Sequence, residues 1–125
     1  MDIIVILKLM TALGIFNVWI LRCNQATEFR GGKSKSLKEE FKAYGLNIWF
    51  MYVIGLIKIL ISVLFIVSFF IADMSTLDLY GSAIMSTIMI GAILMHLKLK
   101  DPIKKSIPAI TMFTMYSIIF LNYIL

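Results

Sequence analysis

The sequence predicts an all-α fold, a four-helix transmembrane bundle, and three observations support this. Hydrophobic residues make up 61% of the 125 residues and charged residues only 15%, whereas soluble domains average roughly 45–50% apolar residues. Four apolar runs are each close to the ~20 helical residues that cross a bilayer. The mean hydropathy of +0.95 would leave large apolar patches on a water-soluble surface. Lipid is therefore the expected solvent, and the whole chain is expected to be one membrane domain.

The first two membrane spans are expected at residues 3–21 and 46–70. The first contains a single charge, Lys8, and the second contains only Lys58. At 1.5 Å per helical residue the first span is about 28 Å long, which matches a hydrocarbon core of ~30 Å. The apolar run around the second, 44–72, is longer than the core. This helix is expected to tilt or to begin among the lipid headgroups.

The third and fourth spans are expected at residues 79–97 and 107–125. The third has no acidic residue, Lys or Arg, and the fourth has no charge at all. In the segment between them Ser106 is a candidate N-cap, and Pro108 falls in the first helical turn, where proline is tolerated. A tight turn at 73–78 is expected to connect the second and third spans.

The connection between the first two spans, 22–43, is the only long one. Its middle is rich in Gly, Ser and Lys, as in surface loops. Ser36, followed three residues later by Glu39, resembles a capped helix start, so an interfacial helix is expected at about 37–44. The only cysteine, Cys23, lies in this connection; an inert thiol is the favoured interpretation, with palmitoylation as the alternative.

Charge places the two basic connections on one side of the membrane. Apart from Lys8 and Lys58, every Lys and Arg lies in 22–43 or 98–106. The positive-inside rule assigns these loops to the cytoplasm and both termini to the outside, in a bacterial plasma (inner) membrane. The net charge of +5 therefore reflects topology, and no nucleic-acid partner is expected.

Lys58 is the strongest candidate for a functional residue. About 18 Å of helix separates it from either end of its span, which is too far for easy snorkelling. On a helical wheel it shares a face with Gly55, Ser62 and Phe65. No other span offers a central carboxylate, so Lys58 is expected to contact a ligand or a partner protein. The alternatives are a neutral, hydrogen-bonded amine, an ion pair with another subunit, or a lysine that reaches a water-filled defect.

Lys8 lies only about 8 Å of helix from the outer end of its span. Simple snorkelling to the surface is the favoured interpretation. The alternative is an ion pair with Asp78 at the outer edge.

Other polar residues in the spans are expected mainly to pack helices together, because small and hydroxyl-bearing side chains allow close approach in lipid. The second interpretation is a polar-lined cavity, and it adds further candidate contacts for a ligand or partner. These are Asn17, Ser86, His96 and Thr114. No catalytic constellation and no metal-binding cluster is evident, so no catalytic activity is expected from this chain alone.

Several segments spread over nearly the whole chain resemble the DoxX-like family of small four-helix membrane proteins. The Tyr-Gly-Leu entry to the second span and the Gly-x-x-Lys within it are the most specific together. The segments are Leu13-Gly-Ile-Phe-Asn-Val-Trp-Ile-Leu-Arg22, Thr27-Glu-Phe-Arg-Gly-Gly32, Glu40-Phe-Lys-Ala-Tyr-Gly-Leu46, Gly55-Leu-Ile-Lys58, Gly91-Ala-Ile-Leu-Met-His-Leu-Lys98 and Lys100-Asp-Pro-Ile-Lys-Lys105.

The resemblance implies a compact bundle, with some relatives acting as membrane subunits of oxidoreductase assemblies and distant ones as assembly factors. This chain has no cysteine pair and no evident haem or iron–sulfur ligation. An accessory or scaffold subunit that binds a membrane-protein partner, a second copy or a lipid-like ligand is therefore expected. One alternative is a quinone-contacting subunit, in which Lys58 donates to a quinone oxygen while Phe65 and Phe69 pack the ring. A small oligomeric transporter is the other.

Overall fold

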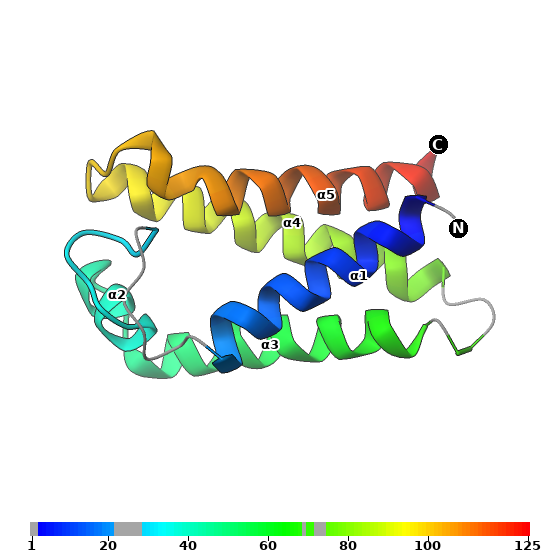
Figure 1. Ribbon diagram of the computed structural model, residues 1–125, viewed down its shortest axis with the longest axis horizontal. Coiled ribbons are helices and arrows are strands. Elements are labelled where there is room, and N and C mark those ends of the chain that lie inside the picture. Colours follow the sequence, from blue (N-terminus) through cyan, green and yellow to red (C-terminus); the bar gives the residue numbers. More distant parts are fainter. Residues whose placement is uncertain (1–2, 22–28, 69, 72–74) are drawn as a thin grey trace.

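The computed structural model describes residues 3–21, 29–68, 70–71 and 75–125, and these residues form helices and short connections (Figure 1). The prediction of an all-α bundle is confirmed. The predictions for Cys23 and Phe69, and the first residues of the turn expected at 73–78, lie outside the described residues. In chain order the elements are α1 (Ile3–Phe16), the π-helical segment η1 (Asn17–Leu21), α2 (Leu37–Ala43), α3 (Ile48–Val67), α4 (Ser75–Lys98), the 3₁₀ segment η2 (Ile103–Ser106) and α5 (Ile107–Ile124).

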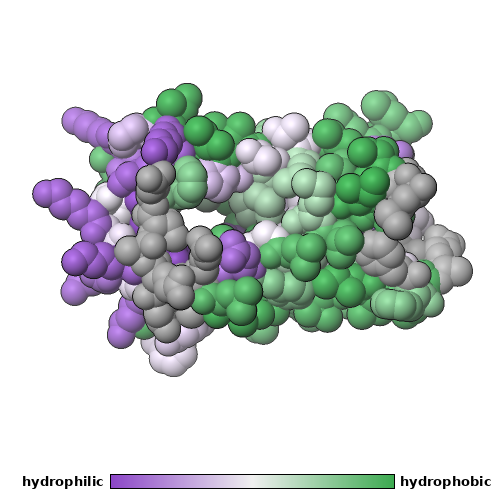
Figure 2. Space-filling model, in the orientation of Figure 1, coloured by the Kyte–Doolittle hydropathy of each residue, from purple (hydrophilic) through white to green (hydrophobic). Residues whose placement is uncertain are grey.

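Four helical segments of the described chain are long and apolar enough to span a membrane. They lie at Ile3–Leu21, Ile48–Val67, Ser75–Lys98 and Ile103–Ile124. Figure 1 shows the four long helices lying roughly along one direction, with α2 across one end and both chain termini at the other. Figure 2 shows the hydrophilic residues gathered at the end with α2, which we call the basic end. The opposite end, with the chain termini, is called the terminal end.

The expected starts of α2 and α5 hold, whereas α4 begins earlier than expected. Ser36 caps α2 by accepting a hydrogen bond from the Glu39 N–H at 3.2 Å. Helix α4 begins at Ser75, so Asp78 lies in its first turn and not in a connection. Ser106 does stand at the N-cap position of α5, but its backbone is helical and its side chain makes no capping hydrogen bond, because η2 runs directly into α5. Pro108 does lie in the first turn of α5.

The short link between α2 and α3 shows why the Tyr-Gly-Leu sequence is needed. Tyr44 ends α2, and Gly45 follows with a φ of +79°, a left-handed conformation that costs glycine little. Asn47 then caps α3 by accepting a hydrogen bond from the Trp49 N–H at 2.9 Å. The chain thus turns from the interfacial helix into the second span within four residues.

The buried core lies between the four long helices. Helices α4 and α5 pack along their length, whereas α1 crosses the bundle from α5 at the terminal end toward α3 at the basic end (Figure 1). Gly81 lets α4 approach the Phe65 ring of α3 in the terminal half. Large apolar side chains also cover the outside, as expected of an integral membrane protein; Leu56 is 68% exposed. The largest fully buried apolar side chains are Phe65, Met85, Tyr116 and Ile119.

Candidate functional site

A cavity of about 1000 Å³ lies in the half of the bundle nearest the basic end. All four spans and α2 contribute to its lining. Helix α1 crosses the bundle diagonally (Figure 1). Figure 2 shows the molecular surface hollowed beside the basic end. The walls are mainly apolar, with a few charged side chains among them. The apolar walls include Val18, Phe41, Ile54, Met89 and Met112.

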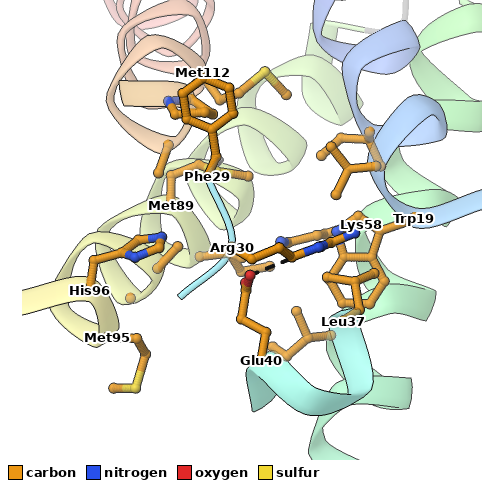
Figure 3. A pocket seen from close by; sticks show the side chains of 18 of the residues that line it. Trp19, Phe29, Arg30, Leu37, Glu40, Lys58, Met89, Met95, His96 and Met112 are labelled. Atoms are coloured by element: carbon orange, nitrogen blue, oxygen red, sulfur yellow. Dashed lines mark ion pairs between the residues drawn. The ribbon is translucent and has the colours of Figure 1, made fainter. Parts of the chain in front are cut away.

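Lys58 is held in this cavity by an aromatic side chain from η1. Its Nζ lies 4.7 Å from the centroid of the Trp19 ring, a cation–π contact. The lysine is 92% buried, since only 8% of its surface is exposed. The described residues supply no hydrogen-bond acceptor and no ion pair to its ammonium group; the Glu40 carboxylate acts on it only through space, at longer range. Figure 3 shows Lys58 and Trp19 together on one wall of the cavity.

Trp19 can reach this position because α3 carries a glycine where the indole ring lies. A Cβ atom on Gly55 would lie 2.6 Å from Cζ3 and 2.7 Å from Cε3 of Trp19. Trp19 also makes an edge-to-face contact with Phe41 of α2, with ring centroids 5.8 Å apart. The π-helical turn η1 carries this residue, and such turns are frequent at functional sites. Gly55 therefore serves to seat Trp19 and is not itself among the cavity-lining residues.

A second cationic side chain enters the cavity from the connection before α2. Arg30 is 5% exposed, and its Nη1 lies 4.0 Å from Glu40 Oε2 (Figure 3). The same Glu40 oxygen accepts a hydrogen bond from the Gly31 N–H at 2.9 Å. Of the described cavity-lining residues, three are basic, Arg30, Lys58 and Lys105, and one is acidic, Glu40. The charged part of the cavity is therefore net positive.

The end of α4 forms a Schellman motif that turns Asp101 back toward the helix. The Asp101 N–H donates to the His96 carbonyl and the Lys100 N–H to the Leu97 carbonyl, both at 3.0 Å. Lys100 adopts the left-handed conformation, with a φ of +57°. As a result Asp101 Oδ2 lies 2.9 Å from His96 Nδ1.

Asp101 also ties the connection before α2 to the end of α4. Both of its carboxylate oxygens accept from the Gly32 N–H, at 3.1 and 3.2 Å. Lys105 donates to the Gly32 carbonyl, and Lys98 donates to the Tyr44 carbonyl at 2.8 Å. These bonds form a polar strap over the basic end of the cavity, which we define as Gly32, Asp101 and Lys105.

Tyr44 packs against Gly31, the residue that precedes this strap. Its ring lies so close to Gly31 that a Cβ there would be 2.6 Å from Cε1. Burial and the nearby Glu40 carboxylate raise the pKa of the Tyr44 phenol well above its usual range. The phenol therefore stays protonated at any physiological pH.

At the terminal end the structure contains the ion pair between Lys8 and Asp78. Lys8 Nζ lies 2.9 Å from Asp78 Oδ2 and 2.8 Å from Ser68 Oγ. The Tyr123 hydroxyl donates to the same carboxylate oxygen at 2.6 Å. Lys8 is only 6% exposed, so its ammonium is not snorkelling to the surface as the favoured interpretation had it. The start of α4 at Ser75 brings Asp78 into the bundle and makes this pair possible.

The structure gathers only part of the predicted contact set in the cavity. Lys58, Asn17 and His96 line it. The other predicted positions lie elsewhere: Phe65 packs on Tyr116 in the core, and the hydroxyls of Ser62 and Ser86 are buried without a partner among the described residues. Thr114 is exposed and bonds to the Ile110 carbonyl of its own helix.

Three residues of the site escaped the sequence reasoning. Trp19 looked like ordinary apolar filling of a span, and Arg30 and Glu40 looked like loop and interfacial charges. The sequence signal that could have found them is the Gly31–Gly32 pair: Gly31 lies against the Tyr44 ring, and Gly32 has a φ of +58°, which favours glycine. His96 is paired with Asp101, and the described residues contain no group of three potential metal ligands.

The fold and the cavity together define a small integral membrane protein, a four-helix bundle with a partly open, largely apolar cavity that carries a net positive charge. Residues 26–118 match the DoxX-like family, and the chain belongs to that family. The sequence matches no curated protein and no solved structure.

Proposed function

We propose that this protein is a noncatalytic accessory subunit of a membrane assembly and that it holds a lipid-like ligand in the cavity. The observation that carries the proposal is Lys58. A lysine that is 92% buried within a membrane span is costly unless something compensates it. Among the described residues only the Trp19 ring contacts its ammonium group, so one side of the group remains available to a ligand.

The shape and chemistry of the cavity favour a ligand with an apolar body and a polar head. A volume of about 1000 Å³ is at the upper end of ordinary small-molecule sites. Apolar side chains of α1, α4 and α5 would surround the body, while Lys58 and Arg30 would meet the head. A single acyl chain or a ring with a short tail has this form.

A quinone is the second candidate ligand. A hydrogen-bond donor beside an aromatic face suits a quinone ring and its carbonyl oxygen, and Lys58 beside Trp19 offers both. Phe65 faces the core and does not line the cavity, so Trp19 and Phe41 take the place that was expected for the Phe65 and Phe69 rings. In this role the protein would contribute part of a quinone site to an oxidoreductase assembly.

We also propose that the basic end lies in the cytoplasm of a bacterial cell and that both termini lie outside. The basic side chains of α2, of the connection before it and of the α4–α5 connection all lie at this end (Figure 2). Such a distribution follows the positive-inside rule. It would also attract anionic lipids of the cytoplasmic leaflet.

The test is purification of the wild type in mild detergent, with identification of every retained protein and small molecule. The matched variant is Gly91→Phe. Gly91 lines the cavity, and a Cβ there would meet no atom within 4 Å, so this position has room for a larger side chain, which is expected to take up part of the cavity. The proposal predicts a lipid-like molecule or quinone with the wild type and its loss with the variant. Bulk lipid alone in both preparations would contradict it.

A further inference from the structure

We propose that the head of the ligand is an anionic oxygen group, a carboxylate or a phosphate, and that Lys58 binds it. This inference rests on the proposed function and specifies the chemistry of the same cavity. It separates acidic amphiphiles from neutral ones, including a neutral quinone. Three features of the cavity support it: the orientation of the lysine, the charge around it and the depth of the site.

The first feature is the orientation of the ammonium group. Trp19 occupies one side of it at 4.7 Å, and this contact leaves the three N–H donors without an oxygen acceptor among the described residues. An aromatic face stabilises a cation but accepts no strong hydrogen bond. An oxygen acid in the cavity would accept from these donors and offset the charge at the same time.

The second feature is the charge balance of the cavity. Glu40 is the one acidic residue among the described lining residues, and it is engaged elsewhere. Its Oε2 accepts from the Gly31 N–H at 2.9 Å and faces Arg30 at 4.0 Å. Glu40 makes no hydrogen bond or ion pair with Lys58 and offsets its charge only in part, through space. A ligand with one negative charge would reduce the excess positive charge of the site.

The third feature is the depth of the site. Lys58 lies on the buried face of α3, near the middle of the helix, and Figure 3 shows it beside Trp19 on the cavity wall. In a medium of low polarity the attraction between opposite charges is stronger than at a surface. A head group at Lys58 would leave its apolar body among the side chains of α1, α4 and α5. The preference for an acid over a neutral head should accordingly be large.

The experiment compares three probes with the same 18-carbon chain: oleic acid, methyl oleate and oleoyl lysophosphatidic acid. Binding is followed by Trp19 fluorescence in protein that carries Trp49→Phe, so that Trp19 is the single tryptophan. We expect the two acidic probes to bind at least about tenfold more tightly than the ester. The ratio between carboxylate and phosphate then identifies the preferred acid.

Variants assign the preference to Lys58. Lys58→Met is expected to bring the affinity for the acids down to that for the ester, and Lys58→Arg to retain most of it. Lys33→Met is the control, because Lys33 is exposed at the basic end and does not line the cavity. It removes the same charge and should leave the preference unchanged.

The outcomes separate this inference from the proposed function. If the ester binds wild-type protein as tightly as the acids do, the inference is overturned while the proposed function stands. If none of the three probes and no quinone binds, the proposed function fails as well. The comparison on wild-type protein decides the matter even where Lys58→Met does not fold.

Discussion

The contact between Trp19 and Gly55 predicts opposite effects for the same substitution at two glycines of the bundle. In Gly55→Ala the added carbon would lie 2.6 Å from the indole, whereas carbon atoms in contact are normally 3.5–4.0 Å apart. The ring must therefore move by about 1 Å. Overpacking of this kind costs about 1–3 kcal/mol of unfolding free energy.

Gly91→Ala supplies the matched control. Its added carbon meets nothing within 4 Å, so only the gain in helix propensity remains, about 1 kcal/mol in favour of alanine. Gly55 lies inside α3 and Gly91 inside α4. Because alanine gains the same helix propensity at both positions, this gain cancels when the stabilities of the two variants are compared. The difference between them should therefore be the packing cost alone, with Gly55→Ala less stable by about 1–3 kcal/mol.

The assay is reversible unfolding in mixed detergent micelles, with the emission of Trp19 recorded in a Trp49→Phe background. Gly55→Ala should also change this emission, because the indole leaves its seat beside Lys58, whereas Gly91→Ala should not. Equal stability of the two variants, with identical Trp19 spectra, would refute the claim that Trp19 packs directly on the backbone of α3.

Three further predictions concern the ends of the bundle. Lys8 and Asp78 form a buried ion pair, so Lys8→Met or Asp78→Asn alone should lower the free energy of unfolding by about 3–5 kcal/mol. The double variant should lose clearly less than the sum of the two single losses; additive losses in thermal or detergent unfolding would contradict the pair. Asp101→Asn replaces the two charged acceptors of the Gly32 amide by one neutral carbonyl oxygen, so hydrogen exchange at that amide should become faster; unchanged exchange would count against the strap. With Cys23 replaced by Ser and the exposed Lys33 replaced by Cys, a membrane-impermeant maleimide should label only inside-out vesicles; labelling of intact cells would contradict the proposed topology.

The sequence was sufficient for the spans because lipid imposes a simple requirement, a helix of about 20 apolar residues. Capping chemistry located α2 in the same way, through Ser36. The start of α4 was missed because Ser75, Thr76 and Asp78 have the composition of a turn, whereas together they begin a helix and bring Asp78 to Lys8. Snorkelling was preferred for Lys8 because a helix considered alone shows no partner from another helix.

The strongest candidate residue of the site could be predicted from the sequence, because it is a charged residue far from either end of an apolar span. Lys58 stood out because a charge in the middle of a span is unfavourable. Its environment depends on contacts between segments distant in sequence: η1 supplies Trp19, and the connection before α2 supplies Arg30. A helical wheel of α3 identifies the face that carries Lys58. It cannot indicate that Phe65 on the same face packs into the core.

Photo-cross-linking tests most directly whether a lipid-like ligand occupies the cavity. A fatty acid with a diazirine near the end of its chain is added to the protein in nanodiscs. The sample is irradiated, and the modified peptides are identified. The account predicts modification of cavity-lining residues such as Val18, Met89 and Met112, with loss of this modification in Gly91→Phe. Modification confined to outward side chains such as Leu56 and Leu60, and unaffected by Gly91→Phe, would contradict it.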